Sequence, residues 1–145
     1  MITDFGYFVH PADLVEQILT FEDPVLFDNV VLEGTAIMHT SGTADFVLAP
    51  GCYSVEVLIS AFPRDAFGQD EVQMFIGVQV DGVTLTDVSL SGTATPLVAV
   101  PRITGGNIFC TNGGTFRIVN ITDPESVSSD IKIFPPTSIK LIKLS

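Results

Sequence analysis

The sequence contains few basic residues and no tryptophan. Lysine and arginine account for only 6 of its 145 residues, against 17 aspartates and glutamates, and the formal net charge is -11. Binding to nucleic acid or to an anionic membrane surface depends on clustered lysine and arginine side chains. The first basic residue is Arg64, so the N-terminal part of the chain has no basic patch. We therefore expect neither nucleic acid nor a membrane as a partner.

Histidine and cysteine are equally scarce, with 2 residues each. A structural zinc site usually needs about four nitrogen or sulfur ligands, whereas His10 and His39 lie far in the sequence from Cys52 and Cys110. We expect no zinc site. For the cysteines we favour two buried thiols that act as small apolar side chains. A disulfide between neighbouring strands is the alternative, because the sequence does not show whether the two residues pair.

Motifs for catalysis are missing as well. The chain has no G-x-S-x-G elbow, no phosphate-binding loop and no H-E-x-x-H pair. His39, Ser41 and Asp45 are close in sequence, but a catalytic triad is defined by spatial geometry rather than by proximity along the chain. Local hydrogen bonds in a turn are the simpler interpretation of these three residues. We predict that the protein is not an enzyme, has no catalytic residues and binds no cofactor.

Long hydrophobic runs are also missing. No segment approaches the roughly 20 apolar residues of a membrane span. The N-terminus does not show a positive region followed by an apolar stretch, since Asp4 comes early and His10-Pro11 interrupts the run. We expect synthesis in the cytoplasm without a signal peptide, and a final location on a virion or on a cell or spore surface.

The dominant pattern is an alternation of apolar and polar residues with a period of two, which indicates half-buried strands. It is clearest over Cys52–Phe62 and Val72–Asp81, and Asp81-Gly82 predicts a tight hairpin turn. Turn residues separate the other short strands, and we interpret Pro135-Pro136 as one of these turns. Many short strands at regular spacing predict an all-β sandwich of the jelly-roll type. The remaining predicted strands are Val25–Leu32, Ala36–His39, Thr43–Leu48, Val83–Leu90, Leu97–Ile103, Asn107–Cys110, Phe116–Asn120 and Ile139–Leu144.

The N-terminal part, residues 1–23, differs from the jelly-roll domain that we expect over residues 24–145. Pro11–Leu19 is the one helix candidate, with an apolar stripe and a proline suited to the first helical position. We therefore expect a short helical or extended segment. It either packs on its own domain or attaches the protein to a neighbour. The candidate attachment residues are Phe5, Tyr7, Phe8, Leu14 and Ile18.

An acidic loop over Arg64–Glu71 is the candidate recognition loop, because loops on rigid sandwiches commonly carry binding sites. Its candidate residues are Asp65, Phe67, Asp70 and Glu71. Oxygen-rich loops can hold calcium, but this spacing matches no defined calcium-binding motif. A solvated loop is the simpler interpretation.

Four stretches together resemble the tumour-necrosis-factor-like jelly-roll superfamily, in particular the complement first-component globular heads and the bacterial collagen-like spore-surface proteins. They are Pro24–Val31, Asp45–Val55, Gln79–Val83 and Ser138–Leu144. The resemblance implies a compact homotrimer, with the closing strand in the inner sheet beside the threefold axis. No Gly-x-y collagen stalk precedes the domain in this sequence, which favours a bacterial or phage surface component attached through its N-terminus.

The closing strand is apolar on both faces, which indicates that both faces are covered. Together with the resemblance, this predicts a trimer interface formed by Tyr53, Ile139, Leu141, Ile142 and Leu144. The resulting hypothesis is a non-enzymatic structural protein, such as a virion decoration or fibre head, that joins a larger assembly. The alternative is a head domain that binds a host receptor or a glycan through its apical loops.

Overall fold

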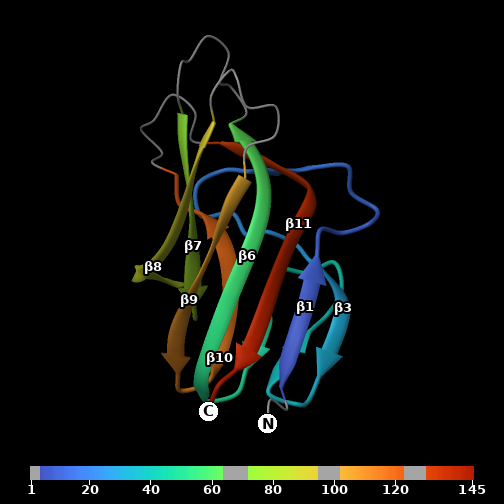
Figure 1. Ribbon diagram of the computed structural model, residues 1–145, viewed down its shortest axis with the longest axis vertical. Helices are drawn as coiled ribbons and strands as arrows, with labels where there is room; N and C mark the ends of the chain where they lie inside the picture. The colour runs from blue at the N-terminus through green and yellow to red at the C-terminus, as the bar shows by residue number, and fades with distance from the viewer. Residues whose placement is uncertain (1–3, 64–71, 95–101, 123–129) are drawn as a thin grey trace.

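The computed structural model describes residues 4–63, 72–94, 102–122 and 130–145. Within these residues the chain forms only strands and turns, arranged as two antiparallel sheets that face each other (Figure 1). No helix among them is long and apolar enough to span a membrane. The predicted all-β sandwich is confirmed.

The larger sheet has the strand order β3-β1-β11-β6-β9, and β2 pairs with β11 beside this path. It lies in front in Figure 1, where the start of β1 and the end of β11 lie together at the lower end of the sandwich. Its strands are β1 (Phe5–Val9), β2 (Gln17–Leu19), β3 (Asp28–Glu33), β6 (Gly51–Pro63), β9 (Arg102–Thr111) and β11 (Ile131–Lys143).

The smaller sheet has the order β4-β5-β10-β7-β8. Its β7–β8 hairpin turns at Asp81 and Gly82, which both have positive φ, as such two-residue turns require. This confirms the hairpin that Asp81-Gly82 predicts. The strands are β4 (Ile37–His39), β5 (Phe46–Leu48), β7 (Val72–Val80), β8 (Val83–Ala94) and β10 (Gly114–Asn120).

The core lies between the sheets and consists of the inward-facing half of each strand. Along β6 the alternation buries Tyr53, Val55, Val57 and Ile59 and turns their neighbours outward, as the sequence predicts. A chain of ring contacts links the two sheets, from Phe46 and Phe116 on the smaller sheet to Phe109 and Tyr53 on the larger one.

The helix expected over Pro11–Leu19 is wrong, and the extended alternative is confirmed for part of the segment. Turns follow Pro11, and Gln17–Leu19 forms β2, which pairs with β11. Two side-chain bonds secure this arrangement, because the Gln17 amide donates to the carbonyl of Leu26 and accepts from its N–H. Pairing to a long strand thus outweighs the weak helical propensity of so short a segment.

Pro135-Pro136 does not form a turn between strands. It lies inside β11, where the register with β6 shifts between Phe134 and Ser138. Prolines lack the N–H needed for a regular ladder and are tolerated where pairing is interrupted. β11 therefore begins at Ile131, eight residues before the closing strand expected at Ile139.

Candidate functional site

The outer face of the larger sheet is the candidate functional site, and we call it the outer face below. Register fixes which side chains share it: Val31 is opposite Tyr7, Tyr7 opposite Lys140, Lys140 opposite Glu56, and Glu56 opposite Gly106. Side chains two positions away along each strand point to the same side. They are Phe5, Val9, Cys52, Ser54, Leu58, Thr104, Ile108, Cys110, Ser138 and Ile142.

Apolar side chains make up much of this outer face, and several of them stay at least partly exposed among the residues that the structure describes. Ile108 is 60% exposed, and Phe5, Tyr7, Leu58 and Ile142 are only half-buried. Apolar surface of this kind on a sheet usually marks a contact with another molecule.

A hollow of about 480 Å³ opens at one end of the outer face. Tyr7, Val9 and Leu58 line it together with Leu14 from the loop after β1 and the Pro135-Pro136 segment of β11. A smaller hollow adjoins it and is lined by Tyr7, Leu58, Glu56 and Lys140. The two hollows give the face a shape that can receive protruding side chains from a partner.

Few charges interrupt this surface. The Lys140 ammonium lies 5.9 Å from the centre of the Tyr7 ring, within reach of a cation–π interaction. Glu56 stands beside Lys140 in the register of β6 and β11. The centre of the outer face therefore carries one charge of each sign, next to an aromatic ring.

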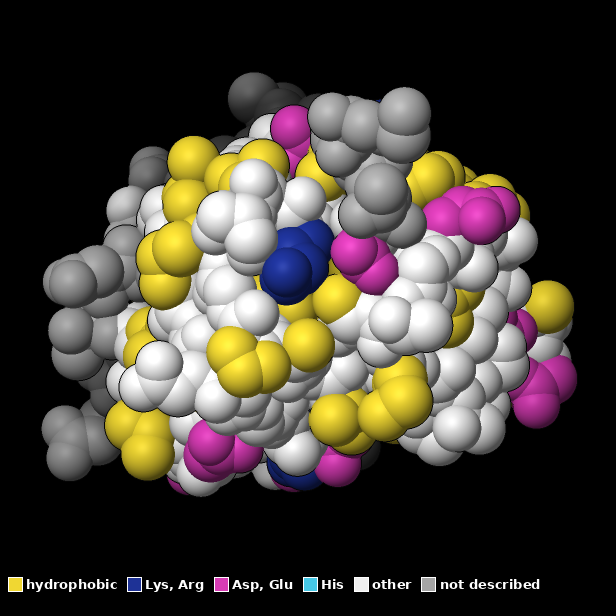
Figure 2. Space-filling model, turned by 90° about the horizontal axis from the view of Figure 1, so that it is seen from below, with side chains coloured by type: hydrophobic (Ala, Val, Ile, Leu, Met, Phe, Trp, Pro, Cys, Tyr) yellow, Lys and Arg dark blue, Asp and Glu magenta, His cyan; other side chains and the backbone are white. Residues whose placement is uncertain are grey.

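The lower end of the sandwich has a different surface. Figure 2 looks at this end, where hydrophobic side chains are scattered between polar ones rather than gathered into one patch. This end of the sandwich therefore offers no single apolar patch in that view.

The interface residues predicted from the sequence divide into two groups. Tyr53, Ile139 and Leu141 are completely buried between the two sheets of the chain itself, so their side chains offer no surface to another subunit. For these three the expectation is corrected: the alternation of strands turns them inward. Ile142 faces outward and is half-buried, and Leu144 is exposed just after β11. Their contact with another subunit stays a prediction.

Tyr53 instead has a role within the chain. Its hydroxyl donates to the carbonyl of Ala49 at 2.6 Å, which holds the turn before β6. Burial, and secondarily the negative charge of Asp4, raises the pKa of the Tyr53 hydroxyl. The hydroxyl therefore stays a donor in neutral solution.

The N-terminal candidates also fall into different environments. Phe8 is buried in the core and packs edge-on against Phe46, so it cannot contact a neighbouring protein. Phe5 and Tyr7 belong to the outer face. Leu14 lines the larger hollow, and Ile18 is exposed. The division at residue 23 stays a prediction; β1 and β2 are strands of the larger sheet, in which both pair with β11.

The candidate recognition loop, with Asp65, Phe67, Asp70 and Glu71, lies outside the described residues. Calcium binding by this loop is therefore not tested by the structure. In the part of the chain that the structure describes, no three histidine, cysteine, aspartate or glutamate side chains are grouped as metal ligands would be.

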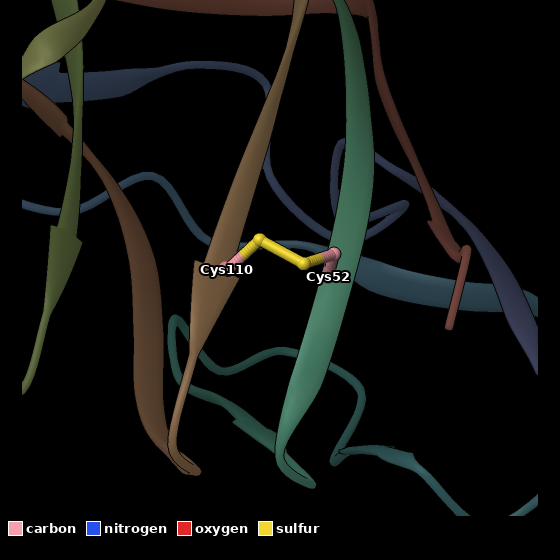
Figure 3. The surroundings of a disulfide bond; sticks show 2 residues. All are labelled: Cys52 and Cys110. Atoms are coloured by element: carbon pink, nitrogen blue, oxygen red, sulfur yellow. A yellow bond between two sulfur atoms is a disulfide. The ribbon is translucent and has the colours of Figure 1, made fainter.

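The two cysteines form a disulfide, which Figure 3 shows bridging β6 and β9. The favoured interpretation as buried thiols is wrong, because both residues face outward and Cys110 is exposed. The strand prediction contained the necessary signal, since Cys52 precedes the inward-facing Tyr53 and Cys110 follows the inward-facing Phe109. Outward-facing cysteines at opposite positions of neighbouring strands are close enough to form a disulfide.

His39 does not form a catalytic triad with Ser41 and Asp45. Its ring stacks on Phe46 with 4.2 Å between centroids, its Nδ1 bonds to Asn29 Oδ1, and its Nε2 bonds to the carbonyl of Thr43 at 2.9 Å. Ser41 Oγ accepts from the N–H of Asn29, and Asp45 pairs with Arg117 at 2.7 Å. The expected local bonding is confirmed only for His39 with Thr43, whereas Ser41 and Asp45 tie this turn to the more distant Asn29 and Arg117.

Comparison with solved structures identifies the fold as the jelly roll of tumour-necrosis-factor-like proteins and complement globular heads. Eiger TNF from S. frugiperda superimposes with a TM-score of 0.66 at 13% identity, covering 100% of this chain and 94% of that one. The globular domain of zebrafish complement 1qA protein gives 0.59 at 12% identity, covering 99% and 98%. PRD1 vertex protein P5 gives 0.55 at 14% identity, covering 100% and 99%.

No protein-family model matches the sequence, and no curated protein matches it significantly. The likeness is therefore one of fold, which confirms the resemblance seen in the sequence. None of these three structures is described as an enzyme.

Proposed function

We propose that the protein is a non-enzymatic structural component that assembles into a homotrimer through its outer face. The observation that carries this proposal is the set of exposed and half-buried apolar side chains on that face of the described residues, with Ile108 60% exposed and two adjoining hollows. The resemblance to the tumour-necrosis-factor-like superfamily, whose members form compact homotrimers, supports an assembly of three subunits.

Contact between copies would bring different parts of the face together. A ring of three requires a head-to-tail interface, in which one patch meets a different patch of the next copy. The outer face offers such a pair, because the exposed Ile108 lies at the β9 edge and the hollow lined by Tyr7 and Leu58 lies toward β1.

Gel filtration with light scattering tests the assembly. We expect a mass of three times 15.5 kDa at micromolar concentration. Ile108→Glu should reduce the mass to that of a single chain, because it would place a charge in the apolar contact. Val83→Glu is a matched control, as Val83 is 65% exposed and lies in the other sheet. A wild-type mass of 15.5 kDa, or equal dissociation by both variants, contradicts the proposal.

We further propose that the trimer joins a virion or a cell surface through the segment between β1 and β3. Three apolar side chains of this short segment are exposed: Val15 is 88% exposed, and Ile18 and Phe21 are exposed as well. The disulfide supports a final location outside the cytoplasm, since disulfides persist in oxidising surroundings. Val15→Asp with Ile18→Ser should leave the trimer intact and abolish its recovery with purified particles; unchanged recovery contradicts this attachment site.

Receptor or glycan binding by apical loops stays a prediction, because the candidate recognition loop lies outside the described residues. Loss of glycan or host-cell binding after replacement of residues 65–71 would support it.

A further inference from the structure

The disulfide lies at one end of the outer face, in direct cross-strand register. Cys52 and Cys110 are opposite each other with 4.0 Å between their Cα atoms. Cys110 is exposed on β9, the last strand of the larger sheet, whereas Cys52 is half-buried on β6, between β9 and β11. A reductant in solution therefore meets Cys110 first.

The two strands do not depend on the disulfide for their pairing. β6 and β9 are paired over ten consecutive positions from Gly51↔Thr111 to Ser60↔Arg102, and the disulfide bridges the second of them. The other nine pairs do not involve the cysteines, and the pairing of Cys52 with Cys110 in the ladder is one of backbone register. Reduction thus requires no separation of the strands, in contrast to a disulfide that is buried in a core.

We propose that Cys52–Cys110 is a thiol-exchange site, which a dithiol reductant opens in the folded protein by attacking Cys110 first. Exposed disulfides are the ones that exchange readily, because a thiolate must reach one sulfur in line with the S–S bond. A shallow hollow along β6 and β9, lined by Ser54, Glu56, Gly106, Asn107 and Ile108, begins at Ser54 and Ile108, the next outward pair after the cysteines, and could hold the rest of a thiol-bearing molecule.

The exchange proceeds in two balanced steps. A thiolate of the reductant attacks Cys110 Sγ, the S–S bond breaks, and its electron pair passes to Cys52 Sγ, which takes up a proton. The second thiolate of the reductant then attacks the reductant's first sulfur, which is bonded to Cys110 Sγ in the mixed disulfide. That bond breaks, and Cys110 leaves as a thiolate that takes up a proton. Two electrons pass to the protein, and the dithiol is oxidised to a cyclic disulfide.

Kinetics of reduction by dithiothreitol test the proposal. Free thiols are trapped with iodoacetamide and counted by mass spectrometry, while pulse proteolysis without reductant measures the unfolding rate. We expect reduction at least about tenfold faster than unfolding, proportional to dithiothreitol concentration, with an unchanged circular dichroism spectrum. A rate that equals the unfolding rate and does not respond to dithiothreitol concentration, in both the wild type and the Ile108→Glu variant, would overturn the proposal.

Two further measurements sharpen the result. Brief exposure to reduced glutathione, followed by an acid quench and peptide mapping, should place glutathione on Cys110; glutathione mainly on Cys52 overturns the order of attack. Ile108→Glu separates this proposal from the proposed trimer. If only the variant is reduced fast, the disulfide exchanges in the free subunit and a second copy covers it in the wild type. If both the wild type and the variant are reduced slowly, the exchange site is overturned.

Discussion

At the residue scale, His39 shows how burial controls a titrating side chain. Burial between aromatic rings lowers the pKa of His39, although the Thr43 carbonyl and the carboxylates of Asp28 and Asp45 act in the opposite direction. The folded protein therefore binds the proton less readily than the unfolded chain does. The contribution of His39 to the free energy of unfolding is therefore fully present above the unfolded pKa of about 6.5. It is lost as the pH falls through the folded pKa.

A pH series tests this sign. Between about pH 7.5 and pH 5.5, the melting temperature of the wild type should fall more than that of His39→Gln, which cannot titrate. Thermal unfolding followed by circular dichroism gives both values. Parallel curves for the two proteins would contradict the assignment of the pH dependence to His39.

Tyr53 provides a second prediction at this scale. Tyr53→Phe removes the donor to the Ala49 carbonyl and keeps the ring in the core. Leaving this partly buried acceptor without its donor should reduce the free energy of unfolding by about 1 kcal/mol. Urea denaturation measures the loss, and Tyr7→Phe on the outer face is the control, for which we expect a smaller change in the isolated subunit.

At the element scale, β1 distinguishes the two interpretations of the N-terminal segment. Phe8 is in the core, so Phe8→Ala should reduce the free energy of unfolding by about 3–5 kcal/mol. Val15→Ala, in the exposed loop after β1, should change it by less than about 0.5 kcal/mol. Equal, small effects in chemical denaturation would mean that β1 is an appendage rather than part of the fold.

The link between β6 and β9 acts mainly on the unfolded chain. Its cysteines are 58 residues apart, so the crosslink restricts a long loop, and its loss should cost roughly 4 kcal/mol of stability in the chain-entropy model. Cys52→Ala with Cys110→Ala, compared by urea denaturation with the oxidised wild type, measures this. No loss of stability would show that the unfolded chain is compact without the crosslink. Loop entropy thus governs stability, while exposure of Cys110 governs the rate of exchange.

At the scale of the whole molecule, charge opposes self-association. Each copy carries a formal net charge of -11, so copies repel one another at low ionic strength. Raising the salt concentration from about 0.02 M to about 0.3 M should strengthen a trimer held by apolar contacts, because salt screens this repulsion. Analytical ultracentrifugation measures the change. Weakening by salt would instead indicate that ion pairs, such as those open to Lys140 and Glu56, dominate the contact.

Much of the molecule follows from local pattern. Alternation along Cys52–Phe62 predicts which side chains of β6 are buried, and Asp81-Gly82 predicts the hairpin, because both depend on neighbours in sequence. The assignment of β2 failed because Gln17–Leu19 owes its conformation to pairing with β11, more than 100 residues later in the chain. The predicted turn at Pro135-Pro136 failed similarly, because a long paired strand can accommodate an interruption in its ladder.

The sequence by itself determined the fold class, the inward set of β6 and the acidic character of the surface, since composition and a period of two are properties of the chain alone. Only the tertiary structure decided that Cys52 meets Cys110, that Tyr53, Ile139 and Leu141 are core residues, and that the neighbouring outward row forms an apolar face. The physical reason is that alternation shows which residues share a face. Which face packs on the second sheet, and which strand lies beside it, depends on pairings between distant segments.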